Sequence, residues 1–512
     1  MLAWTIYISF LGALVLMLLP RGNAAAARAV ALLAAAAGLA LGIAGIVQYR
    51  SAIAVVNADK IVTVANVDWV PSLGIHYHLA ADGISLTLVL LTGLAAVAGI
   101  LFSWNIEHRT KEFFAFYLAL IGGVYGVFLS FDLFLLFVFY EIAIVPKYFI
   151  IAIWGSTRRE YGAMKLALYS FIGSAMVLVG LIAAYVVSGA HSFNVLELAK
   201  YPFPHAFQMW AFPLVFIGFA ILAGMWPFHT WAPTGHVAAP TAASMLLAGV
   251  VMKLGAYGCL RVAMTLFPDG LQAWRDFFAI LAIIGILYGA MVALVQKDFK
   301  FVIGYSSVSH MGFVLLGLMT LNAIGLSGAV LQMFSHGIIA GLLFAVVGRM
   351  VYDRTHTREL DVLQTMGLNK AIPFAAVTFI IASMASMGLP GFSGFAAEFQ
   401  VLIGAWAAFP TLAILTGIGI LIGVAYTLRV LQKAFFGDDE ERRADARSES
   451  AGEHHTPGED GAPLPAISVP EKLGAVLLIA VSLLVGLFPR LLLDVIVPSF
   501  DSPLFDWLRR VS

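Results

Sequence analysis

The chain has 512 residues, of which 61% are hydrophobic and only 11% are charged, and its formal net charge at pH 7 is zero. Soluble domains contain about 25% charged residues. The composition therefore predicts an integral membrane protein, and the zero net charge gives no sign of a nucleic-acid or acidic partner. The single cysteine, Cys259, excludes an internal disulfide and a cysteine-rich metal or iron–sulfur site.

Long apolar runs predict an all-α membrane protein, because a helix needs about 20 mostly apolar residues to cross a bilayer. The runs are continuous, whereas a membrane barrel needs alternating ones. The first run has neither the basic start nor the cleavage site of a signal peptide, so we expect it to remain as a helix. We expect about fourteen transmembrane helices, with approximate spans 2–20, 27–47, 82–103, 113–130, 132–153, 166–188, 208–226, 239–264, 273–295, 301–320, 323–349, 373–407, 410–436 and 471–491.

Basic residues gather in alternate connections between these spans. Short loops rich in Lys and Arg face the cytoplasm. The connections predicted to be cytoplasmic hold Arg21, Arg28, Arg109, Lys111, Arg158, Arg159, Lys165, Lys297, Lys300, Arg349, Arg354, Arg358, Lys370, Arg442, Arg443 and Arg447. The opposite loops hold mainly Arg50, Lys60, Lys200 and Arg275. Both termini are therefore expected on the non-cytoplasmic side of a bacterial inner membrane.

Two of the predicted spans are interrupted, at 226–233 by two prolines and at 387–394 by a run rich in Gly and Pro. Interrupted helices in corresponding places suggest inverted repeats around a mid-membrane site. The breaks lie five helices apart, so we predict five-helix repeats over 113–264 and 273–436. An N-terminal three-helix region over 1–112 precedes them, and a flexible cytoplasmic loop over 437–470 and a C-terminal helix and tail over 471–512 follow. Ordinary proline kinks are the alternative.

Three ionisable residues fall deep within apolar spans, namely Glu141 in 133–153, Lys253 in 239–260 and Glu398 in 395–408. A charge at the bilayer centre costs about 3 kcal/mol on insertion scales, and such residues normally face a bundle interior and mark an ion or proton path. Burial disfavours both charges and pairing favours both, so a buried Glu near a buried Lys is a tunable proton switch. Structural roles for the three are the alternative.

Lys147 follows Glu141 by six residues, about 9 Å along an ideal helix. The two point to different sides of the helix, although Pro146 allows a bend between them. Lys147 either takes part in the switch or extends its amine toward the cytoplasmic end of the helix.

Four histidines, His229, His236, His310 and His336, lie on polar patches of predicted helices. Neutral histidine donates and accepts at once and titrates near neutral pH, so the set favours a proton relay over isolated core residues. Two further pairs, His76 with His78 in the loop before the third helix and His454 with His455 in the polar loop, are weak metal signals for which a surface or structural role is favoured. Nucleotide-binding motifs are missing, so the energy for pumping does not come from ATP or NADH on this chain.

Several strings resemble the antiporter-like subunits of respiratory complex I: PFHTWAP at 227–233, APTAAS at 239–244, GYSSVSHMG at 304–312 and LPGFSGFAAEF at 389–399. The resemblance covers essentially the whole chain. It is greatest to the subunit-M type, also called NuoM or the subunit-4 type, because Glu398 stands where other types usually carry lysine and no long lateral helix follows.

The resemblance implies proton-transfer roles for Glu141, Lys253, His310, His336 and Glu398. For three polar residues near loop ends, Asp132, Asp298 and Lys300, the resemblance gives weaker support for a role in proton transfer. Two departures matter. Leu222 occupies the position of a lysine that usually pairs with the fifth-helix glutamate, and the string before His236 lacks the usual Asp. We hypothesise that Lys147 supplies the missing cation from another helix.

The expected function is proton translocation within a complex I-type NADH:quinone oxidoreductase. Protons would pass from cytoplasmic water to Lys147 or the His229/His236 region, and then through Lys253 and the histidines to Glu398. This chain is expected to hold no cofactor or metal, while the resemblance implies FMN, iron–sulfur clusters and quinone in partner subunits, including other antiporter-like subunits. Alternatives are a subunit of an Mrp-type cation/proton antiporter or of a membrane-bound hydrogenase, and a scaffold with an inactive channel.

Overall fold

The computed structural model describes residues 1–20, 22–54, 60–437 and 464–508. Its helices are α1 (Ala3–Leu18), α2 (Ala24–Ile53), α3 (Gly83–Phe102), α4 (Thr110–Leu129), α5 (Leu133–Trp154), α6 (Arg159–Ser188), α7 (Val195–Leu198), α8 (His205–Ala223), α9 (Trp231–Ala238), α10 (Thr241–Leu246), α11 (Met252–Gly258), α12 (Met264–Leu266), α13 (Pro268–Val295), α14 (Phe299–Met319), α15 (Ala323–Ala345), α16 (Asp353–Thr355), α17 (Leu360–Thr365), α18 (Leu368–Ala371), α19 (Pro373–Ser386), α20 (Ser393–Ala408), α21 (Pro410–Phe435), α23 (Val469–Leu487) and α24 (Arg490–Ser499). Most of the predicted loop 437–470, with His454 and His455, lies outside the described residues.

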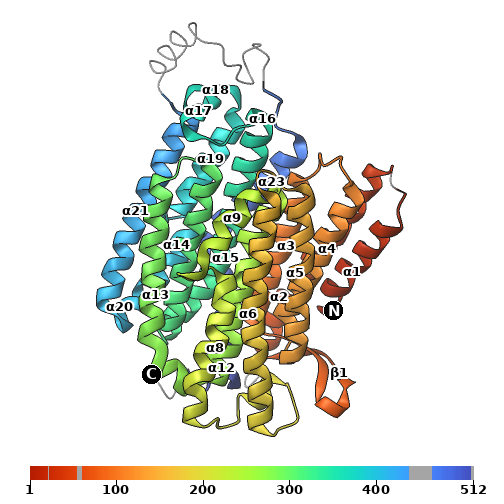
Figure 1. The fold of residues 1–512 in the computed structure, drawn as a ribbon, viewed down its shortest axis with the longest axis vertical. Coiled ribbons are helices and arrows are strands. Elements are labelled where there is room, and N and C mark those ends of the chain that lie inside the picture. Colours follow the sequence, from red (N-terminus) through yellow and green to blue (C-terminus); the bar gives the residue numbers. More distant parts are fainter. Residues whose placement is uncertain (21, 55–59, 438–463, 509–512) are drawn as a thin grey trace.

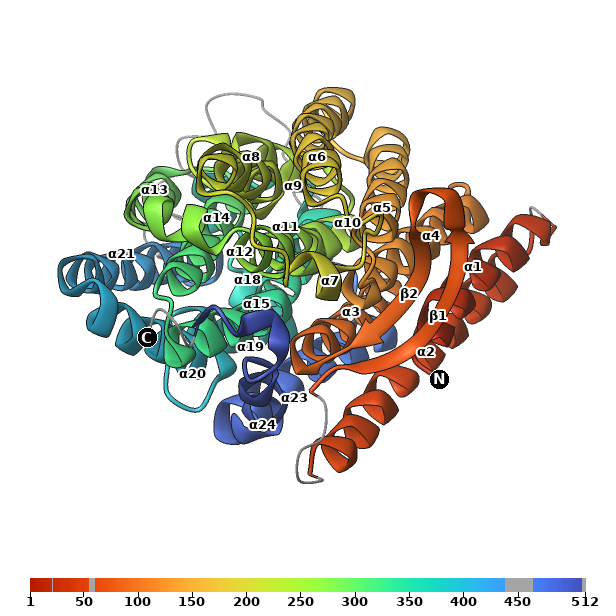
Figure 2. The ribbon, with the colours of Figure 1, turned by 90° about the horizontal axis from the view of Figure 1, so that it is seen from below.

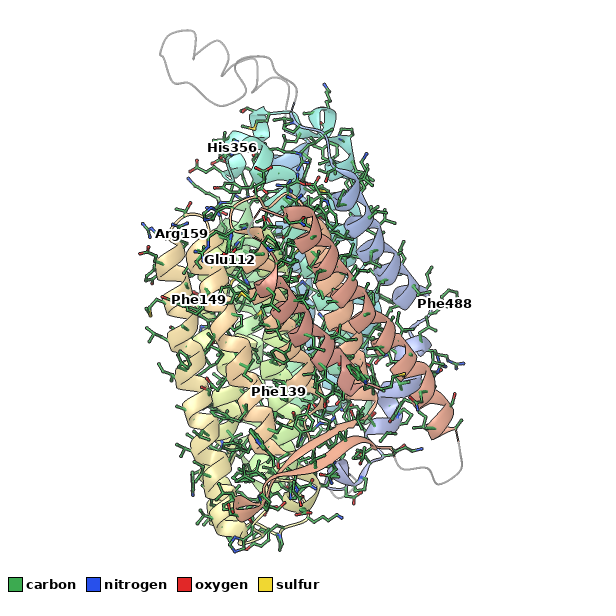
Figure 3. All side chains as sticks on the ribbon, turned by 90° about the vertical axis from the view of Figure 1, so that its right-hand side faces the viewer. Glu112, Phe139, Phe149, Arg159, His356 and Phe488 are labelled. Carbon is green, nitrogen blue, oxygen red and sulfur yellow. The ribbon has the colours of Figure 1, made fainter. Side chains whose placement is uncertain are left out.

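The long helices run side by side through the molecule, with α16 to α18 at one end and α12 and a β-hairpin at the other (Figure 1). Arg159, Glu112 and His356 all lie toward the first end (Figure 3). Since the loops at this end include those whose basic residues predict a cytoplasmic location, we call it the basic end.

Within the described residues, twelve helical runs are long and apolar enough to cross a membrane, and α1 and α19 are shorter apolar helices. The predicted all-α membrane fold is therefore confirmed, while the count of fourteen spans stays a prediction. The span predicted over 373–407 is two helices, α19 and α20, and the span predicted over 208–226 ends earlier, at Ala223.

An antiparallel hairpin of β1 (Val62–Val70) and β2 (Ile75–Ala81) was not expected. Its Val, Ile and aromatic residues favour strands. His76 and His78 lie in β2, so their placement in a loop was wrong. His76 Nδ1 lies 2.9 Å from Asp68 Oδ1, and burial lowers the pKa of His78. No group of three potential metal ligands occurs in the described part of the chain.

Two helix starts, one in each half of the bundle, share the same local structure. Asp132 caps α5 after α4, and Asp298 caps α14 after α13. Each carboxylate accepts hydrogen bonds from the amides two and three residues further on. Each aspartate also forms an isolated strand-like bridge, with Asn194 and Glu359 respectively. These matches support the inverted repeats, which stay a prediction.

The centre of the bundle is formed by two helical runs, 241–266 and 323–355, which are wholly buried over their most apolar 18 residues. Seen along the bundle, α11 and α15 lie in the middle, α1 and α2 on one side, and α20 and α21 on another (Figure 2). The first run contains two π-helical turns, Leu247–Val251 and Cys259–Ala263. Such wide turns are frequent at functional sites.

A fully buried ion pair joins distant parts of the chain near the end opposite the basic end. Arg261 Nη2 lies 2.5 Å from Asp82 Oδ2, and the two side chains are 1% and 0% exposed. Arg261 Nε also donates to the Tyr257 hydroxyl, and the guanidinium lies over the ring of Phe505. The pair thereby connects the start of α3, the second central π-helical turn and the C-terminal segment.

Removing Arg261 is expected to destabilise the protein by about 3–5 kcal/mol, because it leaves a buried carboxylate without its cation. The measurement is the midpoint of thermal unfolding of Arg261→Met in detergent, followed by circular dichroism. The double variant Asp82→Asn with Arg261→Met removes both charges and keeps an oxygen to cap α3, so it should recover part of the loss. Equal instability of the single and double variants would contradict this account.

Candidate functional site

The first interruption lies between α8 and α9. Gly224 ends α8 with a left-handed backbone, φ +82°, which glycine adopts without a Cβ penalty. A short 3-10 turn over Phe228–Thr230 leads into α9. Near the break, the Trp231 indole donates to the Ile221 carbonyl at 2.8 Å. Protein groups thus satisfy backbone that the break frees within the bundle, as membrane depth requires.

The second interruption lies between α19 and α20 and shapes the surroundings of Glu398. Gly388 in the break has φ +69°, and a Cβ there would lie 2.9 Å from Glu398 Oε2. Glycine is therefore needed at this position both for its backbone conformation and for the space that the carboxylate occupies. Ser393, at the start of α20, is hydrogen bonded to Ser335 of α15 at 2.9 Å and to Ser482 of α23 at 3.2 Å.

Glu141 and Lys147 both lie on α5 and face serines of α6. Lys147 Nζ donates to Ser170 Oγ at 3.2 Å, whereas Ser174, close to Glu141, donates to the Phe171 carbonyl of its own helix at 3.2 Å. The serines are four residues apart and so lie on one face of α6. Within the described residues no ion pair joins Glu141 to Lys147 directly, and Glu141 Oε1 has no hydrogen-bond partner.

The Lys147 side chain is only 1% exposed. Its amine is held against α6, so it does not extend along the helix to the surface. Figure 3 shows α5 passing from Phe139 toward Phe149 nearer the basic end, and Lys147 lies on this stretch, after Glu141. The arrangement keeps a lysine within the bundle near a carboxylate, as the hypothesis of a Glu–Lys switch requires.

Lys253 and His336 form the central contact of the bundle. Lys253 Nζ lies 2.6 Å from His336 Nδ1 and donates to the Ala248 carbonyl at 2.5 Å. That carbonyl belongs to the π-helical turn Leu247–Val251, immediately before α11. Lys253 is fully buried and His336 is 4% exposed. No carboxylate is paired with Lys253 in the described part of the chain, so its side-chain partner is the imidazole of His336.

His310 and Glu398 continue this contact toward α20. The rings of His336 and His310 are 5.4 Å apart between centroids, and His310 Nδ1 lies 3.0 Å from Glu398 Oε1. Gln332 Nε2 also donates to Glu398 Oε1 at 3.3 Å. These side chains line a cavity of about 10 Å³, close to the volume that one water molecule needs.

His229 and His236 are buried beside the first interruption. Neither ring nitrogen of either histidine has a hydrogen-bond partner among the described residues. His229 packs edge-on against Tyr288 at 5.1 Å. His236 lies beside Phe344 of α15 at 5.2 Å and within electrostatic range of Lys253. His236 is thus near the central contact, whereas His229 lies on its flank.

The structure therefore brings most of the predicted residues into two groups. Lys253, His336, His310 and Glu398 form one connected group across α11, α15, α14 and α20. Glu141 and Lys147 form a second group with α6, and no hydrogen bond or ion pair joins the two groups among the described residues.

Sequence reasoning missed four polar neighbours within these groups, namely Ser170, Ser174, Gln332 and Ser386. The last of these, Ser386, has its Oγ 3.3 Å from His310 Nε2. The spacing of four between Ser170 and Ser174 was a usable signal. The position of Leu222, buried on α8 with 1% exposure, offers no cation.

Comparison with known proteins agrees with this architecture. Residues 130–423 match the family described as NADH:quinone oxidoreductase/Mrp antiporter, TM. The chain is 38% identical over 440 residues to NADH-quinone oxidoreductase subunit M of Rhodobacter capsulatus. The aligned part covers 83% of this chain and 82% of the relative.

Two solved structures share the fold over the whole chain. A chain of respiratory complex I from Thermus thermophilus has a TM-score of 0.86 and 26% identity, with 100% of both chains covered. A chain of the Mrp complex from Dietzia sp. has a TM-score of 0.84 and 22% identity, with 100% of this chain and 98% of that chain covered. This chain is therefore a member of the NADH:quinone oxidoreductase/Mrp antiporter membrane family, and within that family it is of the subunit-M type.

Proposed function

We propose that this chain translocates protons as an antiporter-like subunit of a complex I-type NADH:quinone oxidoreductase. The observation that carries the proposal is the connected group of Lys253, His336, His310 and Glu398. Lys253 Nζ lies 2.6 Å from His336 Nδ1, and the ring centroids of His336 and His310 are 5.4 Å apart. His310 Nδ1 lies 3.0 Å from Glu398 Oε1. The side chains of Lys253, His336 and Glu398 are buried, and that of His310 is 12% exposed. Ionisable side chains within a membrane bundle mark proton paths.

These groups suit stepwise proton transfer. Lys253 holds a proton that its contact with His336 can share, since neutral imidazole accepts at one nitrogen and donates at the other. His310 then stands between His336 and the Glu398 carboxylate, which takes the proton and releases it toward the side opposite the basic end. The single-water cavity beside His310 and Glu398 supports transfer between rings that do not share a direct hydrogen bond.

Glu141, Lys147 and the serines of α6 form the switch in this proposal. With Leu222 on α8, the cation comes from α5 itself. A carboxylate near a buried lysine favours the protonated amine, and separating them favours its release. Ser170 of α6 holds the Lys147 amine, so a small displacement of α6 relative to α5 changes the position of Lys147 relative to Glu141.

The oxidation of NADH and reduction of quinone belong to partner subunits in this proposal, and this chain is a non-redox part of the translocase. FMN, iron–sulfur clusters and quinone are assigned to those partners, and further antiporter-like subunits are expected as neighbours. The basic end faces the cytoplasm of a bacterial inner membrane, with both termini on the other side, as the loop charges indicate.

Two other functions have specific tests. A subunit of an Mrp-type antiporter or of a membrane-bound hydrogenase would share the fold, since the Mrp chain superimposes at 22% identity. Sodium-dependent transport, or purification with antiporter subunits alone, would favour that alternative. The subunit-M relative at 38% identity favours the complex I type. A scaffold with an inactive channel would leave transport unchanged when Lys253 is replaced.

Replacing Lys253 by alanine is expected to lower proton translocation by about 100-fold or more, the loss typical of removing a positioned proton-transfer group. The measurement is the quenching of a pH-sensitive dye in inverted membrane vesicles that contain the whole complex, driven by NADH. Lys200→Met, which removes an exposed lysine from the opposite loop, is the control. Full pumping by assembled Lys253→Ala complex would refute the proposed path.

Replacing Lys147 by methionine is expected to lower coupled pumping roughly tenfold, the effect of losing a charge interaction of about 1.4 kcal/mol. The double variant Lys147→Met with Leu222→Lys returns a cation to the vicinity from α8 and should recover part of the activity. The proton-to-electron ratio, measured in the same vesicles, separates pumping from electron transfer. Undiminished pumping by Lys147→Met would show that Lys147 does not replace the missing lysine.

A further inference from the structure

A cavity of about 310 Å³, lined by both polar and apolar side chains, opens at the basic end of the bundle. It lies where the 102–108 loop, the end of α5, the junction of α9 with α10 and the π-helical turn Val346–Tyr352 meet. Its polar lining includes Asn105, Glu107, His108, Lys300, Arg349 and Asp353. The switch and the connected group use none of these side chains.

Lys300 lies between this cavity and the bundle interior. It lines the cavity and yet is only 2% exposed. Its Nζ donates to the Ala239 carbonyl at 2.8 Å and to Ser244 Oγ at 3.4 Å. The nearby carboxylate of Asp298 pairs with Arg358 at 3.3 Å instead. A buried lysine without a paired carboxylate among the described residues is costly to keep charged, which makes it a candidate for function.

His236 lies beyond Lys300, toward the centre. It is within electrostatic range of both Lys300 and Lys253, and Ser244, which accepts from Lys300, donates to the His236 carbonyl at 2.8 Å. Both His236 ring nitrogens are buried and have no partner among the described residues. Buried polar atoms are normally hydrogen bonded, and ordered water is the usual partner when protein is not.

We propose that this cavity is the proton entrance of the path and that Lys300 is its first buried relay group, which passes protons to His236 and so to Lys253. The Lys300 amine takes a proton from water in the cavity. It then releases that proton inward, across the Ser244 hydroxyl and water, to a free nitrogen of His236. This inference rests on the proposed function, and it places the entrance where the two predicted repeats meet.

Accessibility tests the entrance without reference to pumping. A single cysteine at Thr241, which lines the cavity, is placed in a Cys259→Ala background and treated with a membrane-impermeant thiol reagent. Labelling is expected in inverted vesicles and not in right-side-out vesicles. A matched cysteine at Thr63, in the hairpin at the opposite end, should show the reverse. Thr241→Cys labelled from neither side, or only from the side that labels Thr63→Cys, would overturn the proposed entrance.

Transport tests the role of Lys300. In vesicles with normal amounts of assembled complex, Lys300→Met and Lys300→Arg should each lower proton translocation by about tenfold or more, because arginine keeps the charge but cannot release a proton. Lys297→Met, which removes an exposed lysine just before α14, should pump normally. Normal pumping by Lys300→Arg would assign Lys300 a merely electrostatic role and overturn the relay.

The Lys253→Ala variant separates the two proposals. If Lys253→Ala abolishes pumping and Lys300→Met does not, the entrance is wrong and the proposed function stands. If neither variant changes pumping, the proposed function fails as well.

Discussion

The hydrocarbon core of a membrane contains no water to hydrogen bond with the protein, so backbone groups that a break in a helix frees must be satisfied inside the bundle. Both interrupted helices obey this constraint. The Trp231 indole takes up a carbonyl of α8 near the first break. At the second, the left-handed Gly388 leaves the room in which the Glu398 carboxylate lies. The interruptions therefore place polar chemistry within the bundle while the surrounding helices stay regular.

The buried charges divide into two kinds. Arg261 and Asp82 form a fixed ion pair that joins α3, the central helical run and the C-terminal segment, because arginine does not give up its proton. Lys253 instead faces a histidine, and Glu398 faces another histidine. In the proposed function, groups of this second kind pass protons to one another, so the same bundle would combine a fixed ion pair with a proton path.

The sequence predicted a membrane protein, both interrupted helices and the buried ionisable residues. Long apolar runs, prolines within them and ionisable residues inside them can each be recognised from a short stretch of sequence. The sequence did not predict the β-hairpin, since a short amphipathic stretch outside the bilayer has no comparable signature. The contact of Lys253 with His336 joins residues 83 positions apart. Such pairings depend on how helices pack, which a single sequence does not specify. The cavity at Lys300 was missed for the same reason.

The contact of Lys253 with a histidine, His336, limits how many protons these two residues can hold at once. Two positive charges at the 2.6 Å that separates Lys253 Nζ from His336 Nδ1 would repel each other strongly. In the proposed function, a proton that reaches Lys253 must therefore wait until the previous proton has moved from His336 to His310. Under this proposal protons pass one at a time, and a blocked transfer from His310 to Glu398 would stop proton uptake from the basic end without a mechanical gate.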